Sequence, residues 1–120
     1  MARAKAVRLN ELAKQINEWA HGKGFWDKPA AVGEAAMWIE QHQKSTKAML
    51  IVTEISELVE HVRSVQPSKL EGFTNEEEEM ADAIIRILDY CGEYKLDIVG
   101  AIAAKMEHNL TRPHKHGKAF

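Results

Sequence analysis

Apolar side chains along this chain recur with the period of an α-helix, and no stretch shows the alternation of a strand. Over residues 7–21 they return every three or four positions, which predicts one amphipathic helix. The apolar positions of this segment are Leu9, Leu12, Ile16 and Trp19. Two glycines and a proline in HGKGFWDKPA break the pattern. The next apolar repeat predicts a long second helix, from about residue 33 to 65.

Two further helices are predicted by their capping residues. Either Thr74 followed by Glu77, or Asn75 followed by Glu78, is a capping pair that starts a third helix running to about residue 94. Asp97 is expected to cap a fourth helix that reaches residue 111, before Pro113 ends it. A chain of 120 residues is expected to form one domain, residues 1–120. The predicted class is therefore all-α, a bundle of four helices.

The predicted third helix is apolar on two sides. Met80 and Ile84 lie on one side, Ile85 and Leu88 lie on another, and only a narrow polar seam separates them. A helix with two apolar sides needs two partners, and a short chain offers few. We therefore expect a homo-oligomer with a helical interface, either a dimer or a tetramer.

Composition limits the function classes. The net charge is −2, with 16 basic and 18 acidic residues, so no overall basic field indicates a nucleic-acid partner. Cys91 is the single cysteine, so an internal disulfide is impossible and a reducing compartment is expected. No apolar run approaches the length of a membrane span. These features together predict a cytoplasmic protein without a membrane partner.

Two pairs of acids stand out because of their spacing. Glu54 and Glu57 lie on one face of the second helix, within its apolar pattern rather than opposite it. Glu79 and Asp82 have the same spacing on the third helix. If the two helices pack antiparallel, the four carboxylates converge. Either pair alone is also compatible with an ordinary solvated surface.

Electrostatics indicates what such a cluster is for. Two like charges about 4 Å apart repel by roughly 4 kcal/mol at an effective dielectric constant near 20, so four clustered carboxylates need protons or cations. All-oxygen ligands suit Mg²⁺, or Mn²⁺ as a substitute, far better than Zn²⁺. We therefore predict a magnesium site, with the number of ions left open. Arg86 and Asp89, further along the third helix, are expected to orient the ligands.

The two carboxylate pairs also carry a resemblance. EISE followed by EMAD resembles the ExxE and ExxD pair of the MazG-type, all-α nucleoside triphosphate pyrophosphohydrolases. The similarity covers about residues 33–118, and EWAHGKGFW is similar to the amino-terminal segment of the small, single-domain members. It implies cleavage of a nucleoside triphosphate between its α and β phosphates, for nucleotide pool control or house-cleaning. The preferred base and sugar stay open.

The resemblance also implies residue roles. Glu54, Glu57, Glu79 and Asp82 would be the Mg²⁺ ligands, and either Glu57 or Glu54 would take the proton of the attacking water. Lys105 and Asn109 match a KxxxN pattern in the closing helix, which implies contacts to substrate phosphate or sugar.

Further substrate contacts are expected from the residues themselves. Arg112 continues the basic surface after Asn109. Trp26 beside Lys23, in the glycine-rich break, is the candidate for contact with the base, because a nucleobase stacks on a flat apolar ring. Trp19 and Trp38 lie inside helical apolar patterns and are expected to be core residues.

Two other classes compete with this interpretation. A ferritin-like di-iron protein needs two ExxH motifs, whereas this chain has one, Glu18 to His21, outside the carboxylate cluster. The alternative to an enzyme is a non-catalytic helical oligomerisation or adaptor module whose acids are solvated.

Overall fold

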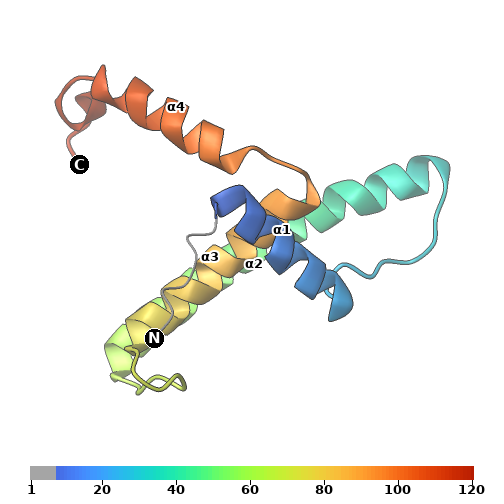
Figure 1. Ribbon diagram of the computed structural model, residues 1–120, viewed down its shortest axis with the longest axis horizontal. Coiled ribbons are helices and arrows are strands. Elements are labelled where there is room, and N and C mark those ends of the chain that lie inside the picture. Colours follow the sequence, from blue (N-terminus) through green and yellow to red (C-terminus); the bar gives the residue numbers. More distant parts are fainter. Residues whose placement is uncertain (1–7) are drawn as a thin grey trace.

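The computed structural model describes residues 8–120, and this part of the chain contains helices and no strand. The elements are α1 (Leu9–Gly22), α2 (Gly33–Ser64), α3 (Asn75–Glu93), α4 (Ile98–Leu110) and a short 3-10 turn, η1 (His114–Gly117) (Figure 1). The all-α prediction is confirmed, and the helices begin and end within a few residues of the expected positions. No helix within residues 8–120 is both long enough and apolar enough to cross a membrane.

Local side-chain contacts explain where α3 and α4 begin. The Thr74 hydroxyl accepts a hydrogen bond from the Glu77 amide at 3.2 Å, and the Glu77 carboxylate accepts one from the Thr74 amide at 3.4 Å. This reciprocal pair is the predicted capping box. Asp97 accepts a hydrogen bond from the Gly100 amide at 3.0 Å and so caps α4 as expected.

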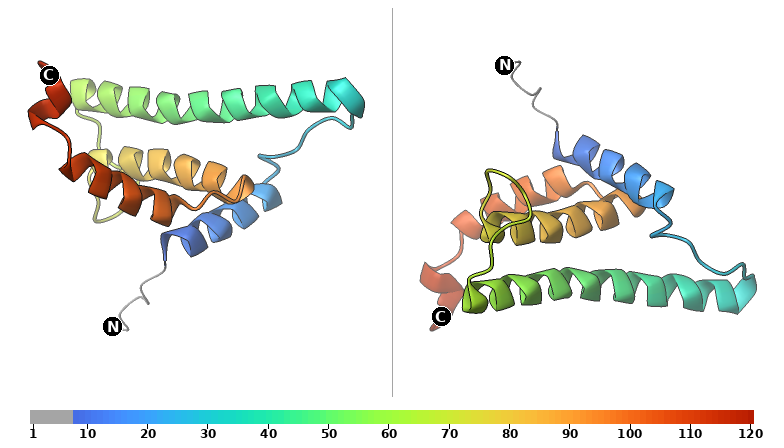
Figure 2. Two further views of the ribbon diagram at one scale, coloured as in Figure 1. Left: turned by 90° about the horizontal axis from the view of Figure 1, so that it is seen from above. Right: turned by 90° about the horizontal axis from the view of Figure 1, so that it is seen from below.

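Helices α2 and α3 run antiparallel, side by side, and α1 crosses the carboxyl-terminal half of α3 (Figure 2). The α1–α3 crossing is close because Gly92 has no side chain: a Cβ atom there would lie 2.5 Å from the Ala13 carbonyl oxygen. Ala13, Leu88 and Cys91 form the small buried core at this crossing. Residues of α3 are therefore shared between two helix neighbours, as its two apolar sides require.

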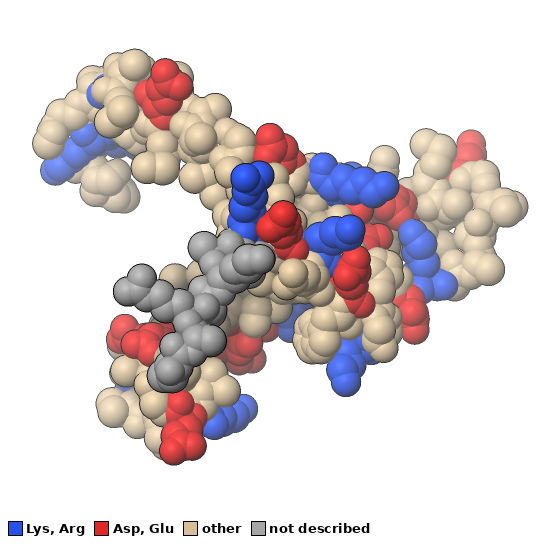
Figure 3. Space-filling model, viewed as in Figure 1, with Lys and Arg blue, Asp and Glu red and all other residues tan. Residues whose placement is uncertain are grey.

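α4 does not close a bundle with the other helices of its own chain. It contacts mainly α1 and points away from the α2–α3 pair (Figure 1). No α4 residue is buried, and Ile102 and Met106 are among its exposed apolar side chains. In the space-filling view this arm is largely uncharged, with basic side chains at its far end (Figure 3).

The chain exposes much more surface than a compact protein of its size. Its accessible surface is 9810 Å², whereas a compact monomer of 13.6 kDa exposes about 6,600 Å². The radius of gyration is 17.7 Å, against about 13.6 Å for a compact domain of 120 residues. A single chain therefore has an open shape with uncovered apolar faces.

Candidate functional site

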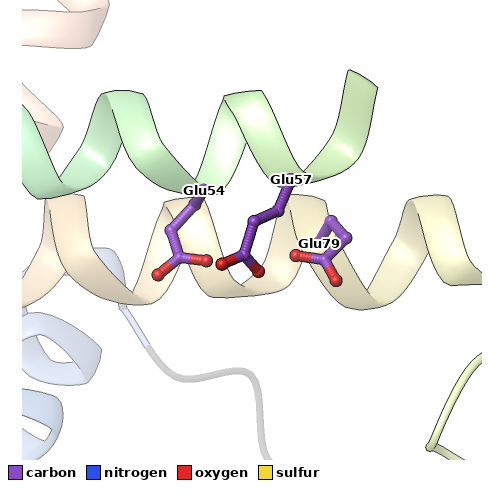
Figure 4. Close-up of side chains that lie close together, drawn as sticks. All are labelled: Glu54, Glu57 and Glu79. Carbon is purple, nitrogen blue, oxygen red and sulfur yellow. The ribbon is translucent and has the colours of Figure 1, made fainter. Parts of the chain in front are cut away.

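Three of the four predicted carboxylates converge between α2 and α3. Glu54 and Glu57 from α2 and Glu79 from α3 each have one carboxylate oxygen within 4.8 Å of the other two (Figure 4). Glu54 is 7% exposed and Glu79 is 3% exposed, while Glu57 is open to solvent. The antiparallel packing of the two helices thus brings the two ExxE and ExxD segments together.

Asp82, the fourth carboxylate, lies beside this group and is half-buried. Burial raises the pKa of Asp82 above its ordinary value, and the neighbouring Glu54, Glu78 and Glu57 charges raise it further. Burial is also the main cause that raises the pKa of Glu79, and Glu57 and Asp82 add to the effect. Both shifts have the sign expected of acids that repel one another in a dry site.

Two cationic or ionisable side chains hold the buried glutamates in place. Arg86 Nε donates to Glu54 Oε1, as the predicted orienting role requires. His61 Nδ1 lies 2.9 Å from Glu79 Oε1, and also 2.9 Å from Asn75 Oδ1. The sequence interpretation did not assign His61 to the site. Its position four residues after Glu57 on the same helix face was the signal that could have identified it.

The donor set fits a hard divalent cation. Every ligand candidate is a carboxylate oxygen, which is the donor type that Mg²⁺ and Mn²⁺ prefer. Glu79 Oε2 is buried and has no hydrogen-bond partner among residues 8–120. A buried carboxylate oxygen without a partner is costly, and a cation at this point would remove that cost.

A cavity of about 130 Å³ adjoins the carboxylates. Its lining combines three aromatic or aliphatic side chains with charged groups of both signs. The lining residues are Trp19, Phe25, Lys47, Glu54, Asp82, Ile85, Arg86 and Asp89. The sequence interpretation did not assign Lys47, Phe25 or Ile85 to the site.

Two tryptophans have exposures opposite to those expected from the sequence. Trp26, the expected base contact, is 5% exposed, and its indole nitrogen donates to both Asp89 carboxylate oxygens, at 2.9 and 3.1 Å. Trp19, expected in the core, is 52% exposed. The reason is the face of α1 that meets α3: Ala13 and Ala20, seven residues apart, are its buried positions, and Trp19 lies about 100° away from Ala20. Trp38 is also exposed, at 61%, rather than in the core.

Asp89 was predicted to orient the metal ligands, and its hydrogen bonds go to α1 and the following loop. Besides Trp26, it accepts a hydrogen bond from Asn17 Nδ2 at 3.0 Å. These contacts tie α1 and the following loop to α3. Among residues 8–120, the side chain of Asp89 has no hydrogen bond to the three glutamates, although it lines the same cavity as Glu54.

The expected phosphate contacts lie elsewhere in the chain. Lys105 and Asn109 are on α4, and Arg112 follows it, so they are on the arm that points away from the α2–α3 pair. Lys23 is exposed at the end of α1. Within one chain, then, the structure brings the carboxylates and Arg86 together, but not the basic residues of α4.

A larger open hollow, about 760 Å³, lies between the amino ends of α1 and α4 and adjoins none of the four carboxylates.

Comparison with models of known protein families, with curated proteins and with solved structures finds no match for this chain. The fold and the site by themselves define an all-helical protein with a candidate cation site made of carboxylates.

Proposed function

We propose that this protein hydrolyses nucleoside triphosphates, including deoxynucleotides, between the α and β phosphates, with Mg²⁺ as cofactor. The observation that carries the proposal is the convergence of Glu54, Glu57 and Glu79 within 4.8 Å, beside Asp82. The choice of substrate rests on the resemblance of EISE and EMAD to the MazG-type pyrophosphohydrolases. The products are a nucleoside monophosphate and pyrophosphate, and the role is nucleotide pool control or house-cleaning.

The four carboxylates divide into holding and proton-accepting groups. Glu54, Glu79 and Asp82, which are buried or half-buried, would hold the cation. A bound Mg²⁺ supplies charge neutralisation at phosphate oxygens and a water of lowered pKa. Glu57 is the best placed general base, because it is exposed to incoming water yet adjoins Glu54 and Glu79. Arg86 and His61 fix the directions of Glu54 and Glu79.

The proposal includes a homo-oligomer. One chain exposes about 3,200 Å² more than a compact monomer of this mass. A permanent subunit interface buries roughly 1,000–2,500 Å² of each partner, so it would cover about a third to three quarters of this excess. Part of this exposed surface is an apolar strip on α2, beside the face that meets α3. The exposed residues of this strip are Val52, Ile55, Val59 and Val62, at spacings of three, four and three. Spacing of this kind is typical of a helix that packs against another helix.

Assembly also gives the basic residues of α4 a role. Lys105 and Asn109 do not line the carboxylates of their own chain, and Arg112 lies at the far end of the same arm. In our proposal a second copy brings these side chains to the phosphates. Lysine supplies a mobile positive charge, and asparagine bonds to sugar or phosphate oxygens.

The test is incubation of the purified protein with each nucleoside triphosphate, with and without Mg²⁺, followed by ion-exchange separation of the products. We expect a monophosphate and pyrophosphate, only with the metal. Glu54→Gln and Asp82→Asn should abolish turnover while circular dichroism shows the helices intact, and the exposed Glu60→Gln on the same helix should be active. No turnover across the panel would refute the proposal and favour a non-catalytic assembly module.

A further inference from the structure

The lining of the cavity next to the carboxylates contains two chemically different groups of residues. The first group is aromatic: Trp19 and Phe25 are 52% and 54% exposed, and their ring centroids lie 5.7 Å apart with planes tilted by 57°. Ile85 adds an aliphatic surface. The second group is the carboxylates Glu54 and Asp82. A ligand that contacts both groups has a flat apolar part joined to an anionic, cation-bound part.

The size of the cavity sets which part of such a ligand it holds. At about 130 Å³ it is well below the roughly 300–1,000 Å³ of pockets that enclose a whole ligand. It therefore suits one flat ring system, with the rest of the molecule extending outside. Half-exposed aromatic rings provide the π faces on which nucleobases stack, largely without regard to sequence.

Lys47 keeps this wall in position. Its Nζ donates to the Phe25 carbonyl oxygen and lies 4.5 Å from the centroid of the Trp26 ring. Burial lowers the pKa of the Lys47 amine below its ordinary value. Because Trp26 is in turn bonded to Asp89, the loop that carries Phe25 is tied to both α2 and α3. The position of Phe25 therefore depends on contacts that do not involve a ligand.

We infer that Trp19 and Phe25 form the stacking wall for the nucleobase of the substrate, in the place that the sequence pattern assigned to Trp26. This inference rests on the proposed function, because the carboxylates, with the cation, must bind the phosphates. Trp19 and Phe25 are ligand-contacting residues in this arrangement, and Lys47 is a positioning residue.

The experiment measures binding rather than turnover. The probes are α,β-imido deoxynucleoside triphosphates of the four bases and inorganic tripolyphosphate, each titrated calorimetrically into the full chain with Mg²⁺. Trp19→Ala should weaken nucleotide binding about tenfold and leave tripolyphosphate binding unchanged, since base stacking on one aromatic side chain has about this effect. Trp19→Phe should restore most of the affinity. Trp38→Ala is the matched control, because Trp38 is similarly exposed but stacks on His42 and does not line the 130 Å³ cavity.

The outcomes separate this inference from the proposed function. Nucleotides that bind no tighter than tripolyphosphate, or a Trp19→Ala variant that weakens both probes equally, would overturn it. A changed subunit number for Trp19→Ala in sedimentation would also overturn it, because Trp19 would then belong to an interface. Phe25→Ala provides a second variant if Trp19→Ala does not fold. A wild-type protein that binds nucleotides through Trp19 but never cleaves them would refute the hydrolase proposal alone.

Discussion

Glu79→Gln gives the sharpest stability prediction for the carboxylate group. Glu79 is 3% exposed, and one of its oxygens lies within 4.8 Å of an oxygen of Glu54 and of Glu57. Two charges at 4.8 Å repel by about 3.5 kcal/mol at an effective dielectric constant near 20, and water around the exposed Glu57 screens that pair further. Glutamine removes this charge, yet its amide oxygen can still accept from His61, now 2.9 Å from Glu79.

We therefore expect Glu79→Gln to stabilise the metal-free protein, by roughly 1–3 kcal/mol after the weakened His61 contact is subtracted. For a chain of this length that corresponds to a rise in Tm of about 4–12 °C. Mg²⁺ at about 100 times its Kd should stabilise the wild type by about 2.7 kcal/mol, and the variant by much less. Thermal unfolding followed by circular dichroism, in EDTA and in MgCl₂, measures both effects.

The exposed Glu60→Gln is the control, because it removes an acid from the same helix without touching the buried group. It should change neither the metal-free free energy of unfolding nor the gain from Mg²⁺ by more than about 0.5 kcal/mol. A Glu79→Gln variant with a lower Tm in EDTA and an undiminished gain from Mg²⁺ would refute the reasoning.

Three further predictions follow from other contacts. The pKa values of Glu79 and Asp82 are raised above their ordinary values of 4.5 and 3.8, so the folded protein binds protons more tightly than the unfolded chain. As the pH rises above those ordinary values, the stability of the metal-free protein should therefore fall, and the stabilisation by Mg²⁺ should grow. Thermal unfolding from about pH 4.5 to 8 checks this, and a gain independent of pH would contradict it. Gly92→Ala should lower the free energy of unfolding by about 1–3 kcal/mol in denaturant, because the new Cβ would lie 2.5 Å from the Ala13 carbonyl oxygen. The control is Gly22→Ala, whose Cβ would meet nothing within 4 Å and which should be neutral or slightly stabilising. Equal effects of the two substitutions would argue against the close α1–α3 crossing. Val59→Glu should dissociate the proposed homo-oligomer in sedimentation velocity, while Glu60→Gln leaves it intact. An unchanged subunit number for Val59→Glu would exclude the apolar strip of α2 from the proposed interface.

The helices and the carboxylate pairs could be predicted because both depend on local spacing. The start of α3 depends on four consecutive residues, from Thr74 to Glu77, and the structure shows the two hydrogen bonds of their capping box. Glu54 and Glu57 share a helix face by arithmetic alone. The convergence with Glu79 then needed only antiparallel packing of two consecutive helices, the usual result of a short connection.

The exposure of Trp19 and the burial of Trp26 could not be predicted because both depend on how two helices cross. Which side of α1 meets α3 is set by the small residues Ala13 and Gly92, which let the backbones approach. That choice leaves Trp19 open to solvent. It also places Asp89 beside Trp26, a partner 63 residues away in sequence that no periodicity reveals.

The direction of α4 could not be predicted from the local sequence pattern either. Its apolar repeat predicts a helix with a covered face, but the repeat does not say whether that face meets its own chain or another. In the structure Ile102 and Met106 are exposed, so the four-helix bundle predicted for one chain is completed, in our proposal, only by a second copy.

The central claim concerns where the triphosphate is cut and which residues allow it. The most direct measurement is ³¹P NMR of a nucleoside triphosphate incubated with the protein and Mg²⁺ in ¹⁸O-enriched water. We predict monophosphate and pyrophosphate signals, with the isotope shift on whichever product received the oxygen of water, and no reaction for Glu79→Gln. A diphosphate signal, or full activity of Glu79→Gln, would contradict the account.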